Sequence, residues 1–297
     1  MNKHAYLIMA YNQWDILKKL LILLDDEKHD IYLHIDKKTH DMPHDITSWT
    51  KESKVYVFQT INVMWADYSQ IECELFLLEK ARKNGDYSFF HLLSGVDLPI
   101  KPKAVIYNFF ESNLNSNFVG IVPKEVYYSV RRVKYYHLFT KVSFYRNCKL
   151  LKVADRCFEY LQKLFFIDRL KGKKLCIIDG WQWFSINKEF TDYVLGNKLL
   201  IKSTFKNTIA SDELVFQTMA YNSEFRKTLF DENDLKKGSM RCIDWERGKP
   251  YTWGNDSSDF EMLIKSECMF ARKFDENHME IVDRIFWEMN RRNTNEQ

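Results

Sequence analysis

Glycine and proline are scarce in this chain, with 9 and 5 copies among 297 residues. Flexible linkers and low-complexity tracts use these residues heavily, and the sequence shows neither these nor internal repeats. A hydrophobic content of 45% and a charged content of 29% are typical of a soluble globular protein. The length therefore allows one large α/β domain or two small ones, with a full hydrophobic core.

Long apolar runs and paired cysteines are also missing. The longest aliphatic run, residues 20–24, is far shorter than the roughly 18 residues that a membrane-spanning helix needs. The apolar stretch 5–11 lacks the charged start and the cleavage site of a secretory leader. The six cysteines include no C-x-x-C pair, which argues against a zinc site and favours reduced thiols. These absences predict a cytoplasmic protein.

The glycine-rich motifs that bind phosphate are absent. No G-x-G-x-x-G and no G-K-[ST] occurs, so the sequence supports neither a dinucleotide-binding Rossmann site nor a P-loop. The first loop reads Tyr11-Asn12-Gln13, which lacks the glycines expected of a methyltransferase.

Positive charge is concentrated in one segment. Residues 124–174 hold fourteen Lys or Arg against four acids, so the segment carries +10 and the rest of the chain −7. Aromatic residues interleave with these cations between 127 and 145. The pattern fits a solvated basic face, a surface for an anionic membrane, or a nucleic-acid-binding module. The last is disfavoured, because no RNP-like or zinc-ligand motif accompanies it and the charge is confined to one segment.

Apolar runs alternate with segments of helical spacing. Strands are predicted at 4–11, 31–35, 55–58 and 89–93, with helices from 14 to 24 and from 69 to 82. Further strands are expected at 175–178 and 241–245, and a final amphipathic helix around 281–289. The order predicts an α/β fold with a mostly parallel sheet, helices on both faces, and ligands at the carboxyl ends of the strands.

An acidic pair, Asp212 and Glu213, precedes apolar residues at helical spacing. The pattern predicts a helix that begins at Asp212, with Ser211 or Asp212 as its N-cap. Glu213 then has two interpretations. It is a surface carboxylate that complements the helix dipole, or a general base held at a helix start beside a pocket. The local residues leave both open.

Six blocks together resemble the core-2/I-branching glycosyltransferase family, glycosyltransferase family 14, which includes β-1,6-N-acetylglucosaminyltransferases and peptide O-xylosyltransferases. The blocks follow the family's order: 34–38 (HIDKK), 63–66 (VMWA), 93–100 (LSGVDLPI), 179–184 (DGWQWF), 212–213 (DE) and 270–274 (FARKF). The resemblance implies a GT-A-type fold, a nucleotide-sugar donor, inversion at the anomeric carbon and no metal cofactor. Most GT-A enzymes hold a metal through Asp-x-Asp, and no two aspartates here are so spaced, although the mixed pair Asp244 and Glu246 remains possible.

The resemblance also implies roles for individual residues. Glu213 matches the family's base, with Asp212 as its rival, since neighbouring helical side chains point about 100° apart. Arg272 and Lys273 match the basic pair that compensates the leaving diphosphate. The remaining nucleotide-binding matches are Asp36, Lys38 and Trp65. For these residues the alternatives are ordinary solvated turns or, for Trp65, core packing.

Sugar or acceptor contacts are expected from a further set. Asp97 and Asp179 match positions that contact the sugar, and Trp245 falls in an acceptor-lining segment. Trp181 is assigned to the pocket and Trp183 to the core. In the basic segment the candidates for acceptor binding are Arg131, Arg132 and Lys134.

Together these expectations describe one GT-A-like domain over 1–297, with a nucleotide-sugar-binding half at 1–123 and an acceptor-binding and catalytic half at 124–297. The expected donor is UDP-GlcNAc, with xylosyl or galactosyl transfer as alternatives. The expected acceptor is a glycan, lipid-linked or on a glycoprotein, in bacterial surface polysaccharide or glycoprotein assembly. Residues 124–174 are expected to contact the anionic inner face of the membrane.

Overall fold

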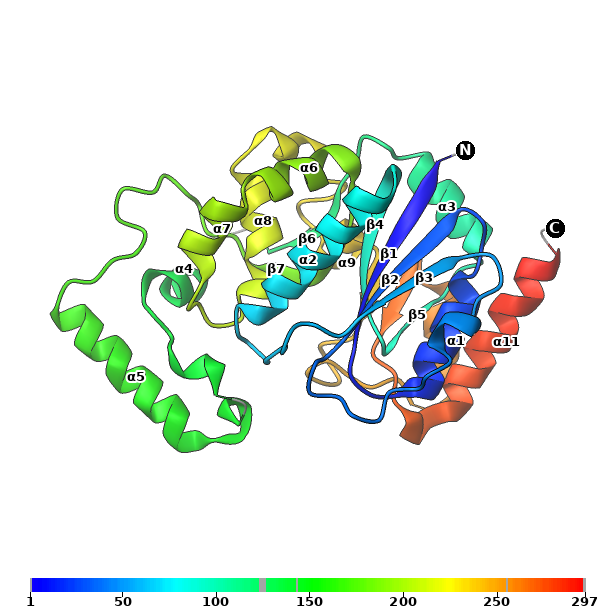
Figure 1. Cartoon of the computed structure of the whole chain (residues 1–297), viewed down its shortest axis with the longest axis horizontal. Helices are drawn as coiled ribbons and strands as arrows, with labels where there is room; N and C mark the ends of the chain where they lie inside the picture. Colours follow the sequence, from blue (N-terminus) through cyan, green and yellow to red (C-terminus); the bar gives the residue numbers. More distant parts are fainter. Residues whose placement is uncertain (1, 123–126, 143, 255, 296–297) are drawn as a thin grey trace.

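A six-stranded sheet forms the centre of the computed structural model, which describes residues 2–122, 127–142, 144–254 and 256–295 (Figure 1). Four neighbouring strands are parallel: β3 (Lys54–Phe58), β2 (His29–Ile35), β1 (Lys3–Ala10) and β4 (Tyr87–Ser94). Next to β4, β7 (Gly180–Asn187) runs antiparallel, followed by β6 (Phe118–Ile121) at the edge. The predicted α/β class with a mostly parallel sheet is confirmed, and it agrees with a GT-A-like fold.

Helices cover both faces of this sheet. One face carries α1 (Trp14–Leu24), α3 (Lys103–Glu111) and α11 (Met279–Asn295). The other carries α2 (Ser69–Asn84), α6 (Lys188–Gly196), α7 (Lys198–Phe205) and α8 (Val215–Tyr221). Along β1, Tyr6 and Ile8 enter the first core while Ala5 and Leu7 enter the second. Successive strand residues point to opposite faces, so a strand covered on both sides is apolar throughout.

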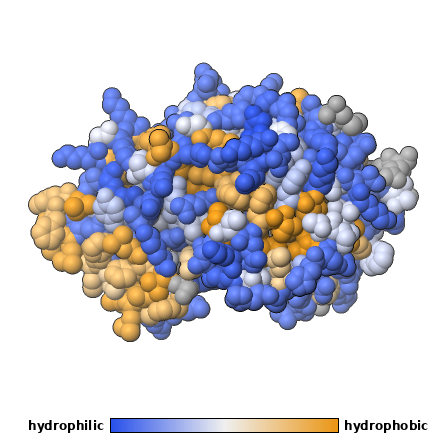
Figure 2. Space-filling model, viewed as in Figure 1, coloured by the Kyte–Doolittle hydropathy of each residue, from blue (hydrophilic) through white to orange (hydrophobic). Residues whose placement is uncertain are grey.

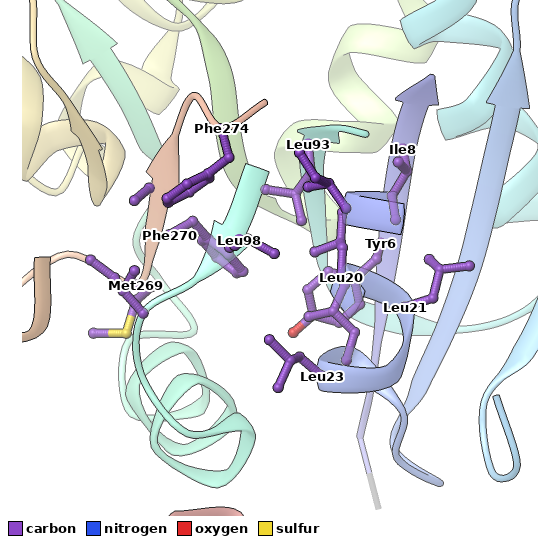
Figure 3. Packing of buried hydrophobic residues seen from close by; sticks show 14 of the residues in the cluster. Tyr6, Ile8, Leu20, Leu21, Leu23, Leu93, Leu98, Met269, Phe270 and Phe274 are labelled. Atoms are coloured by element: carbon purple, nitrogen blue, oxygen red, sulfur yellow. The ribbon is translucent and has the colours of Figure 1, made fainter. Parts of the chain in front are cut away.

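A smaller sheet packs against the first core. It contains β5 (Asp97–Pro99), β9 (Phe270–Arg272) and β8 (Arg241–Ile243), with β5 antiparallel and β8 parallel to β9. Figure 3 shows Leu98 and Phe270 of this sheet, and Phe274 just after it, near Leu20 of α1 and Leu93 of β4. This packing brings residue 272 to the carboxyl end of β4. The strand predicted over 241–245 ends at 243.

The basic segment extends away from the two sheets as a separate projection (Figure 1). We call its described residues, 127–142 and 144–174, the basic arm. It contains α4 (Tyr127–Lys134), two short 3-10 turns at Phe139–Lys141 and Tyr145–Asn147, and α5 (Lys149–Leu164). Residues 124–126 of the charged segment lie outside the described residues. After the arm, 175–178 forms no ladder, so the strand predicted there is wrong and the chain pairs only from β7.

Two short helices, α9 (Leu235–Ser239) and α10 (Ser257–Lys265), complete the fold. In the part of the chain that the structure describes, no helix combines the length and the apolar character needed to cross a bilayer.

The helix predicted to begin at Asp212 begins later. Ser211–Glu213 forms a single 3-10 turn, and α8 starts at Val215, so neither Ser211 nor Asp212 is its N-cap. Ala210 before the turn is left-handed at φ 49°, a conformation that costs a non-glycine residue about 1–2 kcal/mol. Tertiary contacts hold it there: the Ala210 amide donates to the Ala66 carbonyl at 2.8 Å, and its own carbonyl accepts from Arg132.

Candidate active site

The candidate site lies where the carboxyl ends of β1, β2 and β4 meet. The Asp36 amide, just after β2, donates to the Ala10 carbonyl at 2.9 Å, and the Gly95 amide, just after β4, donates to the Met9 carbonyl at 2.9 Å. A Cβ on Gly95 would lie 2.8 Å from the Ala10 Cβ, so only glycine fits here. Backbone hydrogen bonds therefore join the ends of β1, β2 and β4 at the edge where the sequence predicted ligand binding.

Arg132 of α4 joins two predicted site acids. Its Nη1 donates to Asp179 Oδ2 at 3.2 Å, and its Nη2 donates to Glu213 Oε2 at 2.9 Å. Asp179 also accepts from the Ser129 hydroxyl at 2.7 Å. The Arg132 side chain is buried. Its position between the acids makes it a residue that orients Glu213 and Asp179, where the sequence predicted an acceptor contact.

Asp212 and Glu213 occupy different environments. Asp212 is buried, and its Oδ2 accepts from Gln70 Nε2 at 3.2 Å. Burial, and then the neighbouring Glu213, raise the pKa of Asp212 to about 7. The Glu213 side chain is 41% exposed. Burial also raises the pKa of Glu213, and Arg132 opposes that shift. Of the two, Glu213 is the acid that an acceptor from solvent can reach.

Arg272 is fixed at the end of β9 by three neighbours. Its guanidinium lies 4.2 Å from the centre of the Trp183 ring and donates to Asp97 Oδ1 at 2.8 Å and to the Ser94 hydroxyl. Asp97 is fully buried and also accepts from the Ser94 amide at 2.8 Å. The structure thus uses the Asp97 carboxylate to hold Arg272, and it does not present that carboxylate to a sugar.

The two tryptophans of β7 differ in burial, and Trp183, which was assigned to the core, is the one that contacts a predicted site residue. Trp183 lies in the core, with one ring face under Arg272. Trp181 is half-buried, and its carbonyl accepts from Gln217 Nε2 at 2.5 Å. Both contact the same hydrophobic core, in agreement with their two-residue spacing.

The loop around Trp65 connects the predicted nucleotide residues to the acidic turn. Lys38 Nζ lies 3.0 Å from Asp36 Oδ2 and donates to the Val63 carbonyl at 2.5 Å. Gln70 accepts from the Ala66 amide at 2.8 Å and donates to Asp212. The predicted donor-binding and base residues are therefore neighbours in space. The Trp65 ring at the centre of the loop is about half exposed.

Arg146, from the basic arm, is a site residue that the sequence did not single out. Its guanidinium lies 5.2 Å from the centre of the Trp65 ring. The pKa of Lys273 is lowered by burial and by the charges of Arg272 and Arg146, so the three cations are close. Nothing in the sequence distinguished Arg146 from the thirteen other cations of 124–174. Gln70, Ser94 and Ser129 were also missed, because their contacts join distant segments.

Two predicted residues of the basic arm pair with other residues of the arm. Arg131 forms two hydrogen bonds with Glu159 of α5, at 2.5 and 2.6 Å, and so belongs to the packing of the arm. Lys134 Nζ lies 3.2 Å from Asp168 Oδ2. Trp245 lies two residues after Ile243, which pairs with Arg272 of β9, and is about half exposed. Arg131 and Lys134 therefore hold the arm together, and their predicted contact with an acceptor has no support from these partners.

Within the described ranges, no three His, Cys, Asp or Glu side chains are grouped to hold a metal ion. Arg272, Lys273 and Arg146 supply positive charge at the strand-end edge, in addition to Lys38 after β2.

Comparisons with known proteins agree on one family. The family model described as Core-2/I-Branching enzyme matches residues 4–262. Relatives include a xylosyltransferase of Ciona intestinalis, 22% identical over 91% of this chain and 32% of its own. Xylosyltransferase sqv-6 of Caenorhabditis briggsae is 23% identical over 87% of this chain and 33% of its own length. Human xylosyltransferase 2 is 22% identical over 87% of this chain and 30% of its own length. The chain spans about a third of the length of these relatives. Because the family match covers most of the sequence, the chain belongs to the Core-2/I-Branching enzyme family.

Proposed function

We propose that this protein is an inverting glycosyltransferase that moves a sugar from a UDP-sugar to an acceptor hydroxyl without a metal ion. The observation that carries the proposal is an accessible acid, Glu213, on a turn whose contacts lead through Ala66, Trp65 and Arg146 to the cations Arg272 and Lys273. Membership of a family whose relatives are named xylosyltransferases supports the reaction class.

In the proposed reaction, the acceptor oxygen attacks the anomeric carbon from the side opposite the diphosphate. Glu213 takes the hydroxyl proton, and the bond from the anomeric carbon to the diphosphate oxygen breaks. Burial raises the pKa of Glu213, which makes its carboxylate a stronger base than an exposed glutamate. Arg272 and Lys273 compensate the charge that develops on the diphosphate. Arg146 is positioned to add a third cation.

The donor is tested with a panel of UDP-GlcNAc, UDP-xylose and UDP-galactose. UDP-GlcNAc is the donor expected from the family resemblance, and the names of the relatives favour its alternative, UDP-xylose. The true donor should raise the melting temperature and be hydrolysed or transferred. We expect turnover to persist in EDTA. Activity that is lost in EDTA and restored by Mn²⁺ would refute the metal-independent mechanism.

The two halves expected from the sequence supply different parts of this proposal. Residues 1–123 contribute the Asp36, Lys38 and Trp65 region for the nucleotide, and 124–297 contribute Glu213 and the cations. We propose that the acceptor is a glycan, either lipid-linked or on a glycoprotein. We also propose that the protein acts in the cytoplasm, where residues 124–174 contact an anionic membrane. The charge of +10 on that segment favours electrostatic attraction to anionic lipid headgroups.

A further inference from the structure

Helix α5 of the basic arm packs with its polar side toward the protein. Asp155, Glu159 and Gln162 are buried, and their spacing of four and three residues places them on one face. Asp155 Oδ2 lies 2.6 Å from His137 Nδ1, and Glu159 pairs with Arg131. Gln162 bonds both the amide and the carbonyl of Tyr136, at 2.8 and 2.9 Å. The helix is therefore attached to α4 and the segment after it mainly through polar contacts.

The opposite side of α5 is apolar and faces solvent. Leu150, Val153, Leu161 and Leu164 recur at helical spacing about half a turn away from the buried acids, and all four are exposed. Phe165 and Phe166 continue the surface beyond the helix, and Phe166 is 92% exposed. Figure 2 shows apolar surface gathered over this end of the molecule. A contiguous apolar patch of this kind marks a surface that another apolar phase covers.

Cations border the apolar stripe. Lys149, Lys152 and Arg156 are exposed along one flank of α5, and Lys171 and Lys174 are exposed after it. The acids of the arm that the structure describes lie elsewhere: Asp155 and Glu159 are buried, and the half-buried Asp168 pairs with Lys134. The exposed surface of α5 thus combines apolar side chains with positive charge.

We propose that α5 lies in the headgroup region of an anionic lipid bilayer, with its leucines and Phe165–Phe166 inserted and its cations among the headgroups. A helix with a basic flank and an apolar face suits this position. A second copy of the chain fits poorly, because it would bring two rows of cations together. The inference goes beyond the electrostatic contact already proposed and does not depend on sugar transfer.

The arm also contacts the candidate site. Thr140 donates to Asp67 Oδ1 at 3.2 Å, and Arg146 lies against Trp65. A bilayer that holds α5 would therefore keep the site close to the membrane surface, where a lipid-linked or membrane-bound acceptor would be found.

Vesicle flotation tests the insertion. Wild-type protein should bind vesicles of phosphatidylcholine with phosphatidylglycerol, and part of that binding should survive high salt, because apolar contacts are not screened. The triple variant Leu161→Ser, Leu164→Ser, Phe166→Ser should bind roughly tenfold more weakly or worse. The matched control is Leu199→Ser, which changes an 84% exposed leucine on α7 and should bind as wild type does.

Four outcomes would overturn the proposal. Three are wild-type protein that does not float, a triple variant that floats as well as wild type, and binding that vanishes entirely at high salt. Sedimentation velocity supplies the remaining one: a wild-type dimer that becomes monomeric in the triple variant would make this face a self-association surface. Circular dichroism should show an unchanged fold, since the substituted side chains are exposed. Transfer to a water-soluble acceptor should be unaffected, which separates failure of docking from failure of the proposed activity.

Discussion

At the scale of single residues, two adjacent acids illustrate how environment assigns a role. Asp212 points toward Gln70 and is buried, with one carboxylate oxygen lacking a partner among the described residues. Glu213 points toward Arg132 and is open to solvent on the other side. A base must reach the proton that it removes, so accessibility favours Glu213 although the pKa of Asp212 is raised to about 7.

Replacing Glu213 with glutamine should remove the proposed base and keep the side-chain shape. We expect kcat to fall by about 10²–10⁴-fold while UDP binding changes little. Single-turnover transfer and calorimetric UDP titration would measure the two quantities. Asp212→Asn is the matched control and should retain most activity. The reverse result, with Asp212→Asn inactive and Glu213→Gln active, would assign the base to Asp212.

Asp97 is expected to act through Arg272. Asp97→Asn keeps the size of the side chain but removes the negative charge that holds the guanidinium at 2.8 Å. The KM for the nucleotide sugar should rise about tenfold, since a charge-assisted hydrogen bond contributes about 1.5–3 kcal/mol. Initial rates over a range of donor concentrations would test this, with the melting temperature as a check on folding. Unchanged kcat and KM in Asp97→Asn would contradict this positioning role.

At the scale of elements, strand β2 contains two buried neutral histidines. His29 Nδ1 lies 2.8 Å from the Leu24 carbonyl, and His34 Nε2 accepts from the Ile61 amide at 3.0 Å. Burial lowers the pKa of each from 6.5 to about 4. Both groups therefore resist protonation in the folded state, whereas the unfolded chain takes up protons below pH 6.5.

Acid should consequently destabilise the fold through β2. The contribution of each histidine is complete above pH 6.5 and is lost as the pH falls toward 4, with an upper limit of about 3 kcal/mol for each. We expect the melting temperature to decline between pH 7 and pH 4.5. The variant His34→Gln retains an acceptor for the Ile61 amide and should show a shallower decline. A melting temperature that stays constant over this range would contradict the assignment.

At the scale of the whole molecule, the main sheet separates two hydrophobic cores, and the strand-end site depends on both. Leu7→Ala would leave a cavity between β1 and the helices of the second core, because Leu7 is fully buried. We expect the free energy of unfolding in urea to fall by about 2–5 kcal/mol. Leu199→Ala, on the surface of α7, should change it by less than about 0.5 kcal/mol. Equal effects would show that the second core does not limit stability.

The amino-acid sequence by itself determined the alternation of elements in the first hundred residues. The parallel strands and helices α1 and α2 follow from apolar periodicity, which is a local property. The six ordered blocks also identified the family, and they pointed to Glu213 and Arg272 before any geometry was known. Their proposed chemical roles remain predictions.

Only the tertiary structure decided how these residues are arranged. The turn at 211–213 departs from the predicted helix because Ala66 and Arg132 hold Ala210 in place from distant segments. Arg146 reaches Trp65, and Asp97 is committed to Arg272, through contacts that no local pattern encodes. The amphipathic pattern of α5 is visible in the sequence, but a pattern does not state which side faces the protein. In the structure, the acids of α5 are buried against Arg131 and His137. The polar side of the helix therefore faces the protein, and the apolar side faces solvent.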